Sequence, residues 1–258
     1  MIISHRHRFI FIHCRKVAGS SIAAYLAQWL GPDDLMVDSW NDALRAGATY
    51  NRRFVRDLMT PRGLSEAFRW GLTDLKRGRL PSRRNLNRAY FALYDGKIGD
   101  RAKFATAANL RRWAPWEWRT YFKFCFVRNP YAKAVSDYHW RTSRRGAKHI
   151  SFTEFLRRVN NPGRPDPEKL VSRPKDNWPL YTIDDEVAVD WVGRLETFAR
   201  DFETVCNRIG IPFEKSRIPH AKGRPNGSRN YRSCYADGDV GLAYAAYRKE
   251  IDHFGYSF

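Results

Sequence analysis

An apolar strand that leads into a basic loop and then a helix occurs twice in this chain, and this order constrains the fold more than any other feature. The first copy begins with the apolar run FIFIHC at residues 9–14 and continues directly into RKVAGSS at residues 15–21. From Ile22, apolar residues recur at helical spacing until Gly31 and Pro32 supply a helix stop. The continuous apolar character of residues 9–14 is typical of a buried strand in a parallel sheet.

The second copy begins with the apolar run YFKFCFV at residues 121–127. Arg-Asn-Pro at residues 128–130 halts this run, and residues 131–140 predict a helix with the proline at or just before its first turn. Similar patterns predict one further strand and two further helices, at residues 187–192, 198–209 and 240–251. Strands that alternate with helices predict an α/β fold with a mainly parallel central sheet flanked by helices.

The chain is strongly basic, with 46 Lys and Arg against 27 Asp and Glu and a net charge of +19. Eleven Lys and Arg against three acids fall within residues 51–90, so we interpret about residues 38–100 as a basic, partly helical insertion. The chain of 258 residues otherwise suits a single domain, residues 1–258, because single cores stop growing at roughly 250 to 300 residues. A basic surface of this kind attracts acidic partners.

The four cysteines, Cys14, Cys125, Cys206 and Cys234, lie far apart and form no CxxC pair, so no zinc module is predicted. The first three lie in apolar stretches and are interpreted as small buried side chains. Such thiols favour a reducing compartment. No apolar segment reaches about 18 residues, and residues 1–8 carry no signal-type apolar run, so we expect a cytoplasmic protein.

The first basic loop has the composition of an anion-binding loop. The first turn of a helix leaves backbone N–H groups unpaired, and the aligned peptide dipoles add roughly half a positive charge there. Gly19 allows the backbone to approach a ligand closely, and Ser20 and Ser21 add hydroxyl donors. Arg15 and Lys16 add full positive charges. Because the lysine precedes the glycine and no Gly-Lys-Ser/Thr closes the loop, the pattern is not that of a standard ATPase.

The second basic loop offers similar chemistry about 110 residues later. Arg128 lies at the end of the predicted strand, and Ser136 lies about two helical turns further on. These two side chains suit a second phosphate. A ligand with anionic groups at both ends would explain why two separate basic loops are needed.

Together, in this order, the two loops resemble those of the sulfotransferase superfamily that uses 3′-phosphoadenosine 5′-phosphosulfate (PAPS). The chain looks most like the carbohydrate sulfotransferase branch (sulfotransferase family 2), which has a Lys-Val-Ala-Gly-Thr-Ser loop and an Arg-Asn-Pro-(Tyr/Trp)-x-Arg-x-x-Ser-x-Tyr segment. The resemblance is carried by residues 15–21, 124–131, 135–139, 191–196, 201–202 and 247–258. It implies a P-loop-like sulfotransferase fold, and it does not extend over about residues 32–100 or 141–185.

The resemblance also implies roles for individual residues. Those that would cradle the 5′-phosphosulfate of PAPS are Arg15, Lys16, Val17, Ala18, Gly19, Ser20 and Ser21. Arg128 and Ser136 would hold the 3′-phosphate, and a late basic and aromatic segment would cover the nucleotide through Arg229 and Tyr231. The chain departs from the usual pattern in having Ser at position 20 instead of Thr, Arg at 15 instead of the frequent Pro, and Lys at 133 instead of Arg.

The implied reaction moves the sulfuryl group from PAPS to a hydroxyl or amine acceptor and releases 3′-phosphoadenosine 5′-phosphate (PAP). Lys16 is the candidate to neutralise charge on the leaving oxygen, and no metal is required. An acceptor hydroxyl also benefits from a general base, but Phe104 stands where relatives often carry His. His13 is our candidate base, with a purely structural role as the alternative for this side chain. His220, Glu117 or an acceptor that needs no base are the other options.

We expect the acceptor to be a carbohydrate or another small or lipid-linked molecule. The basic insertion favours an acidic glycan, or an anionic membrane surface that presents the acceptor. A homologue that binds PAPS or PAP without catalysis is an alternative motivated by Phe104. A nucleic-acid-binding protein is a remote alternative, because no RNA-recognition, zinc-finger or helix-turn-helix signature accompanies the charge, and we expect no nucleic-acid partner.

Overall fold

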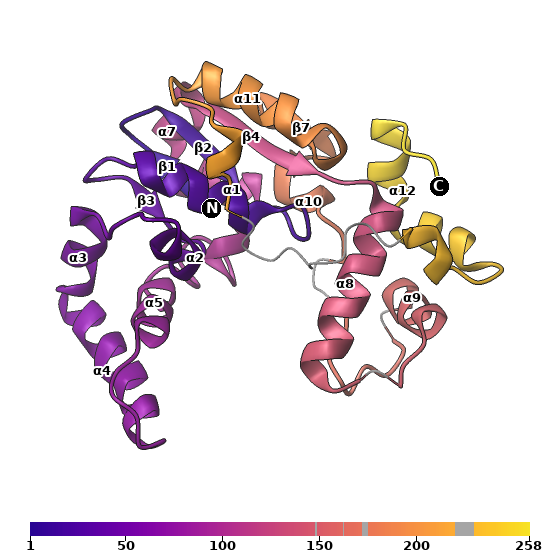
Figure 1. Cartoon of the computed structure of the whole chain (residues 1–258), viewed down its shortest axis with the longest axis horizontal. Coiled ribbons are helices and arrows are strands. Elements are labelled where there is room, and N and C mark those ends of the chain that lie inside the picture. The colour runs from indigo at the N-terminus through magenta and orange to yellow at the C-terminus, as the bar shows by residue number, and fades with distance from the viewer. Residues whose placement is uncertain (148, 162, 172–174, 220–229) are drawn as a thin grey trace.

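A five-stranded sheet with the order β3-β1-β2-β4-β7 forms the centre of the computed structural model, which describes residues 1–147, 149–161, 163–171, 175–219 and 230–258 (Figure 1). Its strands are β1 (Ile2–Ser4), β2 (Phe9–Ile12), β3 (Leu35–Met36), β4 (Phe122–Val127) and β7 (Trp191–Arg194). Strands β2, β4 and β7 are parallel to one another, whereas β1 pairs antiparallel with both β2 and β3. A separate two-stranded hairpin consists of β5 (Thr182–Ile183) and β6 (Glu186–Val187).

The helices follow the strands in chain order. They are α1 (Gly19–Leu26), α2 (Trp40–Arg45), α3 (Arg52–Leu58), α4 (Pro61–Leu75), α5 (Arg83–Ala92), α6 (Ala107–Trp113), α7 (Pro115–Thr120), α8 (Pro130–Arg145), α9 (Phe152–Asn160), α10 (Trp178–Tyr181), α11 (Phe198–Arg208) and α12 (Asp239–Phe254). Short 3₁₀ turns occupy Ala27–Trp29 (η1), Ala102–Phe104 (η2), Leu195–Thr197 (η3), Lys215–Arg217 (η4) and Tyr231–Cys234 (η5). The predicted α/β fold with a mainly parallel central sheet flanked by helices is confirmed.

Strands β2 and β4 are buried because helices pack against the sheet. The side chains of β2 are fully buried, and those of β4 are buried after Phe122. Phe202 of α11 contacts both Tyr25 of α1 and Phe126 of β4, with ring centroids 5.3 and 6.1 Å apart. This burial on both faces is why β2 appears in the sequence as a continuous apolar run, and β4 as an apolar run interrupted only by Lys123.

The predicted basic insertion is helical, and it contains α2 to α5. An aromatic stack anchors it: the ring centroid of Phe54 lies 4.0 Å from that of Tyr50 and 4.3 Å from that of Tyr90. From this anchor, α4 and α5 extend away from the sheet as a helical hairpin (Figure 1). That residues 1–258 fold as one domain stays a prediction.

A second buried cluster lies between α8, α9 and α12. It includes Tyr131 of α8, Phe155 of α9 and Tyr247 of α12. Figure 1 shows these three helices grouped on the opposite side of the molecule from the α4–α5 hairpin. The two helical parts therefore lie on opposite sides of the molecule.

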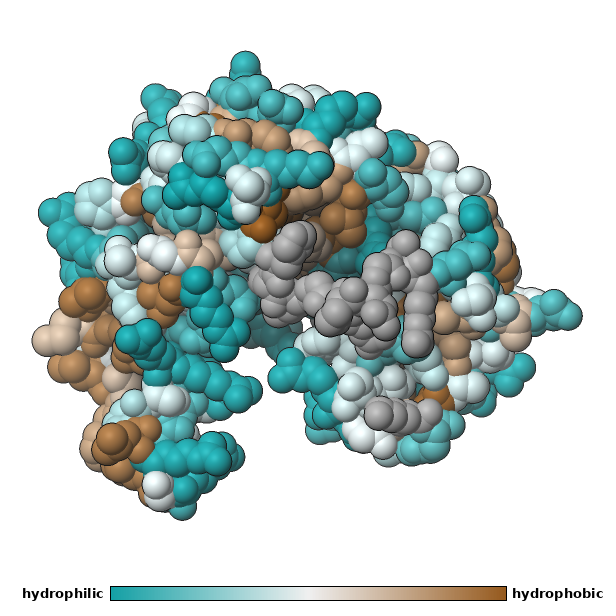
Figure 2. Space-filling view, viewed as in Figure 1, coloured by the Kyte–Doolittle hydropathy of each residue, from teal (hydrophilic) through white to brown (hydrophobic). Residues whose placement is uncertain are grey.

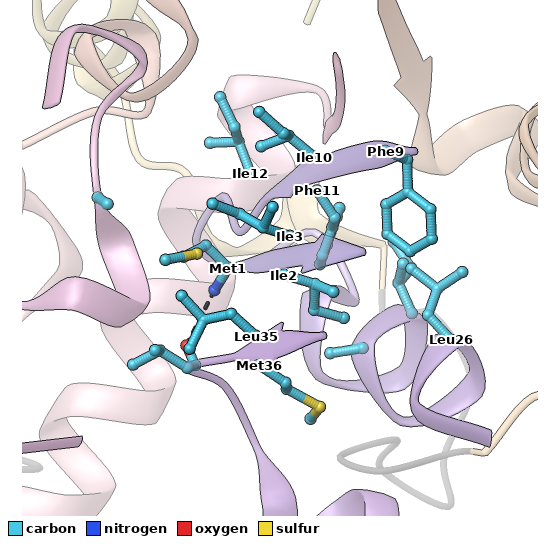
Figure 3. Close-up of a cluster of buried hydrophobic side chains, with 14 of the residues drawn as sticks. Met1, Ile2, Ile3, Phe9, Ile10, Phe11, Ile12, Leu26, Leu35 and Met36 are labelled. Atoms are coloured by element: carbon cyan, nitrogen blue, oxygen red, sulfur yellow. Dashed lines mark hydrogen bonds between the residues drawn. The ribbon is translucent and has the colours of Figure 1, made fainter. Parts of the chain in front are cut away.

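The N-terminal strand was not predicted, and the strand predicted at residues 187–192 is observed as β7, shifted to Trp191–Arg194. Ile3 of β1 pairs with Ile10 of β2 and Leu35 of β3, so three short strands form one apolar layer (Figure 3). At the other edge, Asp184 and Asp185 have positive φ angles and close the β5–β6 hairpin, so the chain reverses before β7 begins at Trp191. A strand of three residues and a tight acidic turn leave weak sequence signals.

Among the residues that the structure describes, no helix is both long and apolar enough to cross a membrane.

The contact between β4 and β7 yields a test of the sheet. A Cβ atom on Gly193 would lie 2.5 Å from the ring of Phe126, so we expect Gly193→Ala to destabilise the protein by about 1–3 kcal/mol through overpacking. Gly241→Ala in α12 is the matched control, because its added methyl group meets nothing within 4 Å and alanine favours a helix. Urea denaturation measures both variants; an equal effect of the two would contradict the packing shown.

Candidate active site

The two basic loops leave the sheet at one edge, at matched positions. Strands β2 and β4 are parallel neighbours, and Ile12 lies opposite Cys125. Arg15 and Arg128 each lie three residues beyond this pair. Because the carboxyl ends of parallel neighbours meet at the same edge, the geometry brings the two loops predicted from the sequence side by side, as is usual for ligand sites of α/β proteins.

Asn177 fixes the backbone at the start of the first loop. Its side-chain amide accepts a hydrogen bond from the Arg15 N–H at 2.9 Å and donates one to the Arg15 carbonyl at 3.0 Å. Asn177 itself is fully buried. Beyond Arg15, Lys16 and Ala18 have φ angles of 63° and 59°, which cost about 1–2 kcal/mol each for residues other than glycine. The loop is thus held in a defined and strained shape.

Helix α1 begins at the end of this loop without a side-chain cap. Ala18 occupies the N-cap position, and its carbonyl accepts hydrogen bonds from Ser21 N at 2.8 Å and from Ile22 N at 3.1 Å. The predicted role of Gly19 in approaching a ligand stays a prediction, and the structure adds a packing reason for a glycine at this position. A Cβ atom there would lie 2.6 Å from Nε2 of His13, so the glycine allows the loop to pack on this imidazole.

Helix α8 lines the other side of the first loop. The ammonium of Lys16 lies 5.4 Å from the ring centroid of Trp140, which is 39% exposed. Burial lowers the pKa of Arg15, Asp137 partly offsets this, and Arg141 adds to the lowering. Asp137 and Arg141 form an ion pair at 3.0 Å along α8. The charged side chains of the first loop therefore lie close to those of α8.

Arg128 lies where β4 ends, and the structure places Tyr231 near it. Burial lowers the pKa of Arg128, while Glu196 and Tyr231 act in the opposite direction. The 3₁₀ turn that contains Tyr231 is held against α8 by Tyr235, whose hydroxyl donates to the Tyr131 carbonyl at 2.9 Å. The structure thus brings together two residues, 103 positions apart in the sequence, that the resemblance assigned to the nucleotide.

Ser136 lies in α8, four residues before Trp140, so both fall on the same side of that helix. It is half-buried. Arg229 and His220 lie outside the described residues. Lys133 is buried behind this surface, with its ammonium 4.3 Å from the ring centroid of Tyr247 and 3.7 Å from the Glu250 carboxylate. It supports the packing of α8 on α12.

A buried charged network lies directly behind the first loop. Asp38 is fully buried; one carboxylate oxygen accepts from Nδ1 of His13, and the other lies 2.9 Å from the ammonium of Lys103. Lys103 also donates to Ser39 Oγ at 2.7 Å, and Ser39 Oγ lies 3.1 Å from Ser20 Oγ. Asp38, Lys103 and Ser39 therefore connect the candidate base to a hydroxyl of the loop.

The pKa values in this network define its charges. Burial lowers the pKa of His13 to about 3, so its imidazole is neutral at pH 7. Burial opposes ionisation of Asp38, yet His13 and Lys103 hold the pKa of its carboxyl well below the usual value. The arrangement is a neutral imidazole whose Nδ1–H donates to a carboxylate, which leaves Nε2 as the acceptor nitrogen.

Phe104 occupies the space between His13 and Arg15. Its ring meets the imidazole edge to face, with centroids 5.4 Å apart, and the Arg15 guanidinium lies 4.8 Å above the same ring. The residue that stands in place of the expected histidine is therefore at the site, where it packs without offering a proton acceptor. Glu117 lies in α7, before β4 begins, at the opposite end of this strand from Arg128.

In the described part of the chain, no group of three or more His, Cys, Asp or Glu side chains is placed to hold a metal ion. Cys14, Cys125 and Cys206 are buried free thiols, as predicted, and Cys234 is a half-buried free thiol. Burial raises the pKa of Cys206 to about 12, so that thiol stays protonated.

Comparison with known families decides how these loops are to be interpreted. The model of the sulfotransferase family matches residues 1–257. The chain belongs to the sulfotransferase family. This membership confirms the resemblance drawn from residues 15–21 and 124–139, and it implies a transferase that moves a sulfuryl group. The α/β sheet with basic loops at its carboxyl edge is consistent with the sulfotransferase fold.

An uncharacterized protein of Archaeoglobus fulgidus is similar to this sulfotransferase, with 32% identity over 104 residues. The match covers 36% of this chain and 72% of that protein. Comparison with solved structures gives no significant match.

Four residues that shape the site were not predicted from the sequence. Asn177 and Trp140 contact Arg15 and Lys16 of the loop. Asp38 and Lys103 instead contact His13 and Ser39, which lie behind the loop. Most of these contacts join segments far apart in the chain. Trp140 alone had a signal, because it lies one helical turn after Ser136 on the predicted helix. The other three carry no local pattern that sets them apart.

The Asn177 contact leads to a test of the loop. We expect Asn177→Ala to lower the free energy of unfolding by about 1–3 kcal/mol, because it removes the two hydrogen bonds that this side chain makes with the N–H and carbonyl of Arg15. Urea denaturation and amide exchange of the loop measure the change. Asn207→Ala, at an exposed position of α11, is the control. An Asn177→Ala effect no larger than that of the control would contradict the role of this clamp.

Proposed function

We propose that this sulfotransferase uses PAPS as its donor and transfers the sulfuryl group to a hydroxyl or amine of a carbohydrate or another small or lipid-linked acceptor. The observation that carries the proposal is the matched position of Arg15 and Arg128 at the ends of adjacent parallel strands. In the reaction, the acceptor atom forms a bond to sulfur as the bond from sulfur to the bridging oxygen breaks. That oxygen leaves with PAP, and the acceptor's proton passes to a base.

The donor would lie across the two loops. Residues 15–21 would hold the 5′-phosphosulfate with the backbone of a strained loop, the first turn of α1 and the charges of Arg15 and Lys16. Arg128 and Ser136 would hold the 3′-phosphate, and Tyr231, which lies near Arg128, would cover the nucleotide. The proposal also assigns Arg229 to the nucleotide, although this residue lies outside the described part of the chain. The partial burial of Arg15 and Arg128 supports this arrangement, because a charge screened less by water attracts an anion more strongly.

Lys16 is the proposed leaving-group residue. Its position opposite Trp140 places the ammonium between the first loop and α8, where the 5′-phosphosulfate would lie. A cation aimed at the oxygen on which charge develops stabilises the transition state more than the ground state.

His13 is the proposed base, and Asp38 would position it. The hydrogen bond from Nδ1 to Asp38 orients the ring and leaves the lone pair on Nε2, which faces Gly19 of the donor loop. Because only 5% of the His13 surface is exposed, the acceptor atom would have to approach the imidazole past the donor loop. Phe104 fills the place of the histidine found in relatives, and its contact with His13 supports a shift of this role to the neighbouring imidazole.

An acidic acceptor fits the surface around Trp140. This indole is partly exposed, and the cationic groups of Lys16, Arg144 and Arg141 lie 5.4, 5.0 and 5.8 Å from its ring centroid. A flat apolar ring bordered by cations suits a sugar that carries a carboxylate or a sulfate. A cytoplasmic location is also part of the proposal, and the free thiols support it.

The first test replaces the leaving-group residue. We expect Lys16→Ala to lower the rate of transfer from PAPS by about 100-fold or more while the fold stays intact, since one aimed donor is commonly worth that factor. Transfer of labelled sulfate to a panel of glycans, lipids and small alcohols measures the rate, and the rise in melting temperature with PAP measures nucleotide binding. Lys215→Ala, at an exposed position of η4, is the matched control.

The outcomes of this test separate the candidate functions. A normal rate in Lys16→Ala would reject the role of this lysine. PAP binding by the native chain with no transfer to any acceptor would favour the homologue without catalysis. Affinity for RNA that falls steeply with salt and is not competed by PAP would favour the nucleic-acid-binding protein.

The second test uses pH. Because burial lowers the pKa of His13 to about 3, the imidazole is already neutral at pH 5, and we expect kcat/KM to stay level between pH 8 and pH 5 on this account. His13→Gln should lower kcat by about 100- to 10,000-fold and leave the PAP-induced rise in melting temperature unchanged. A fall in kcat/KM with a midpoint near 6.5 would assign the base to a histidine of ordinary pKa.

A further inference from the structure

Large exposed apolar side chains gather on the helical insertion. Among the described residues with such side chains, six lie between positions 55 and 80: Val55, Met59, Leu64, Phe68, Leu75 and Leu80. Figure 2 shows the same concentration of hydrophobic surface on the part of the molecule where α3 and α4 extend away from the sheet. A single exposed leucine needs no explanation, whereas a contiguous apolar surface marks an interaction site.

On α4 the exposed apolar residues form a stripe along the outer face of the hairpin. Leu64, Phe68 and Leu75 follow at offsets of four and seven, so they lie on one side of the helix, and they are 50%, 69% and 54% exposed. We call these three residues the apolar stripe. The opposite side of α4 packs inward, where Asn85 of α5 donates to the Trp70 carbonyl at 3.1 Å. The stripe is therefore not part of the hairpin's own packing.

Basic residues flank the apolar stripe. Arg62, Arg69 and Lys76 are exposed along α4, between the stripe and the inward side, and the tip and the start of α5 add Arg77, Arg79, Arg83 and Arg84. Glu66 pairs with Arg69 at 3.4 Å and is the only acid of α4 besides the buried Asp74. The surface around the stripe is thus positively charged.

We propose that the α4–α5 hairpin docks onto an anionic lipid bilayer. A helix with an apolar face, basic flanks and low overall hydrophobicity lies in the interface of a membrane, with its apolar side chains at the boundary of the acyl region. Each Lys or Arg near the surface adds attraction to anionic headgroups. Leu80, at the tip of the hairpin, is 85% exposed and extends the apolar contact beyond α4.

Charge complementarity favours a bilayer over a second copy of this chain. Two copies that met through the apolar stripe would bring Arg62, Arg69 and Lys76 of each close to those of the other, and like charges at an interface oppose association. An anionic surface instead neutralises these cations while it covers the stripe.

Docking in this way would orient the molecule. In Figure 1 the hairpin and α8, which lines the candidate active site, both extend downward from the sheet, the hairpin at the left and α8 at the right. The proposal goes beyond the proposed function, because binding to lipid needs neither PAPS nor an acceptor.

The experiment is cosedimentation of the full chain with vesicles of phosphatidylcholine alone and of phosphatidylcholine mixed with phosphatidylglycerol. We expect binding to the mixed vesicles and little binding to phosphatidylcholine. The variant Leu64→Ser with Phe68→Ser should weaken binding about tenfold or more, because two apolar side chains no longer enter the interface. The variant Arg69→Gln with Lys76→Gln should weaken it to a similar degree and reduce its dependence on salt.

The controls separate this proposal from folding defects and from the proposed function. Trp116→Ser removes an apolar side chain of similar exposure outside the insertion and should bind vesicles like the native chain. All variants should keep the PAP-induced rise in melting temperature of the native chain. No binding of the native chain to mixed vesicles, or equal binding of the stripe variant and the native chain, would overturn the proposal. A native dimer in light scattering that Phe68→Ser dissociates would assign the stripe to a second copy instead.

Discussion

The parallel pairing of β2 with β4 is the constraint on which the rest of the site depends. Because Ile12 lies opposite Cys125, the two loops that follow these strands leave the sheet at the same edge, next to each other. Every other contact of the site adds to this one: α8 follows the second loop directly, and it turns Trp140 toward Lys16 of the first. A slip of the register by one residue would exchange the two faces of a strand and separate the charges.

The buried carboxylate of Asp38 is the second organising group. A lone charge there would be costly, so its stability depends on His13 and Lys103, which bond to its two oxygens. Asp38 follows β3, and its two partners come from the residue after β2 and from η2, so the network ties the beginning of the insertion and its end to the donor loop. The chemistry of the loop and the folding of the insertion are therefore coupled through one acid.

The sequence predicted those features that leave a local pattern. Strands β2 and β4 are largely apolar runs, and the helices α1 and α8 begin at a glycine and a proline, so their order and the basic loops were predictable. Asn177 and Lys103 were not, because each acts on a partner more than sixty positions away and neither belongs to a motif. The apolar stripe was missed for another reason. The charges of residues 51–90 predicted only a basic surface. The packing of α4 on α5 shows which leucines of α4 face outward.

The left-handed angles at Lys16 and Ala18 carry one more consequence. Glycine would relieve the steric cost at either position, yet it would also give the loop more rotational freedom, and an anion would then have to order that loop as it bound. Lys16 and Ala18 thus keep the backbone of the loop strained but conformationally restricted. A preorganised loop loses little conformational entropy when its ligand binds. This favours a reaction whose rate depends on the orientation of the reacting groups.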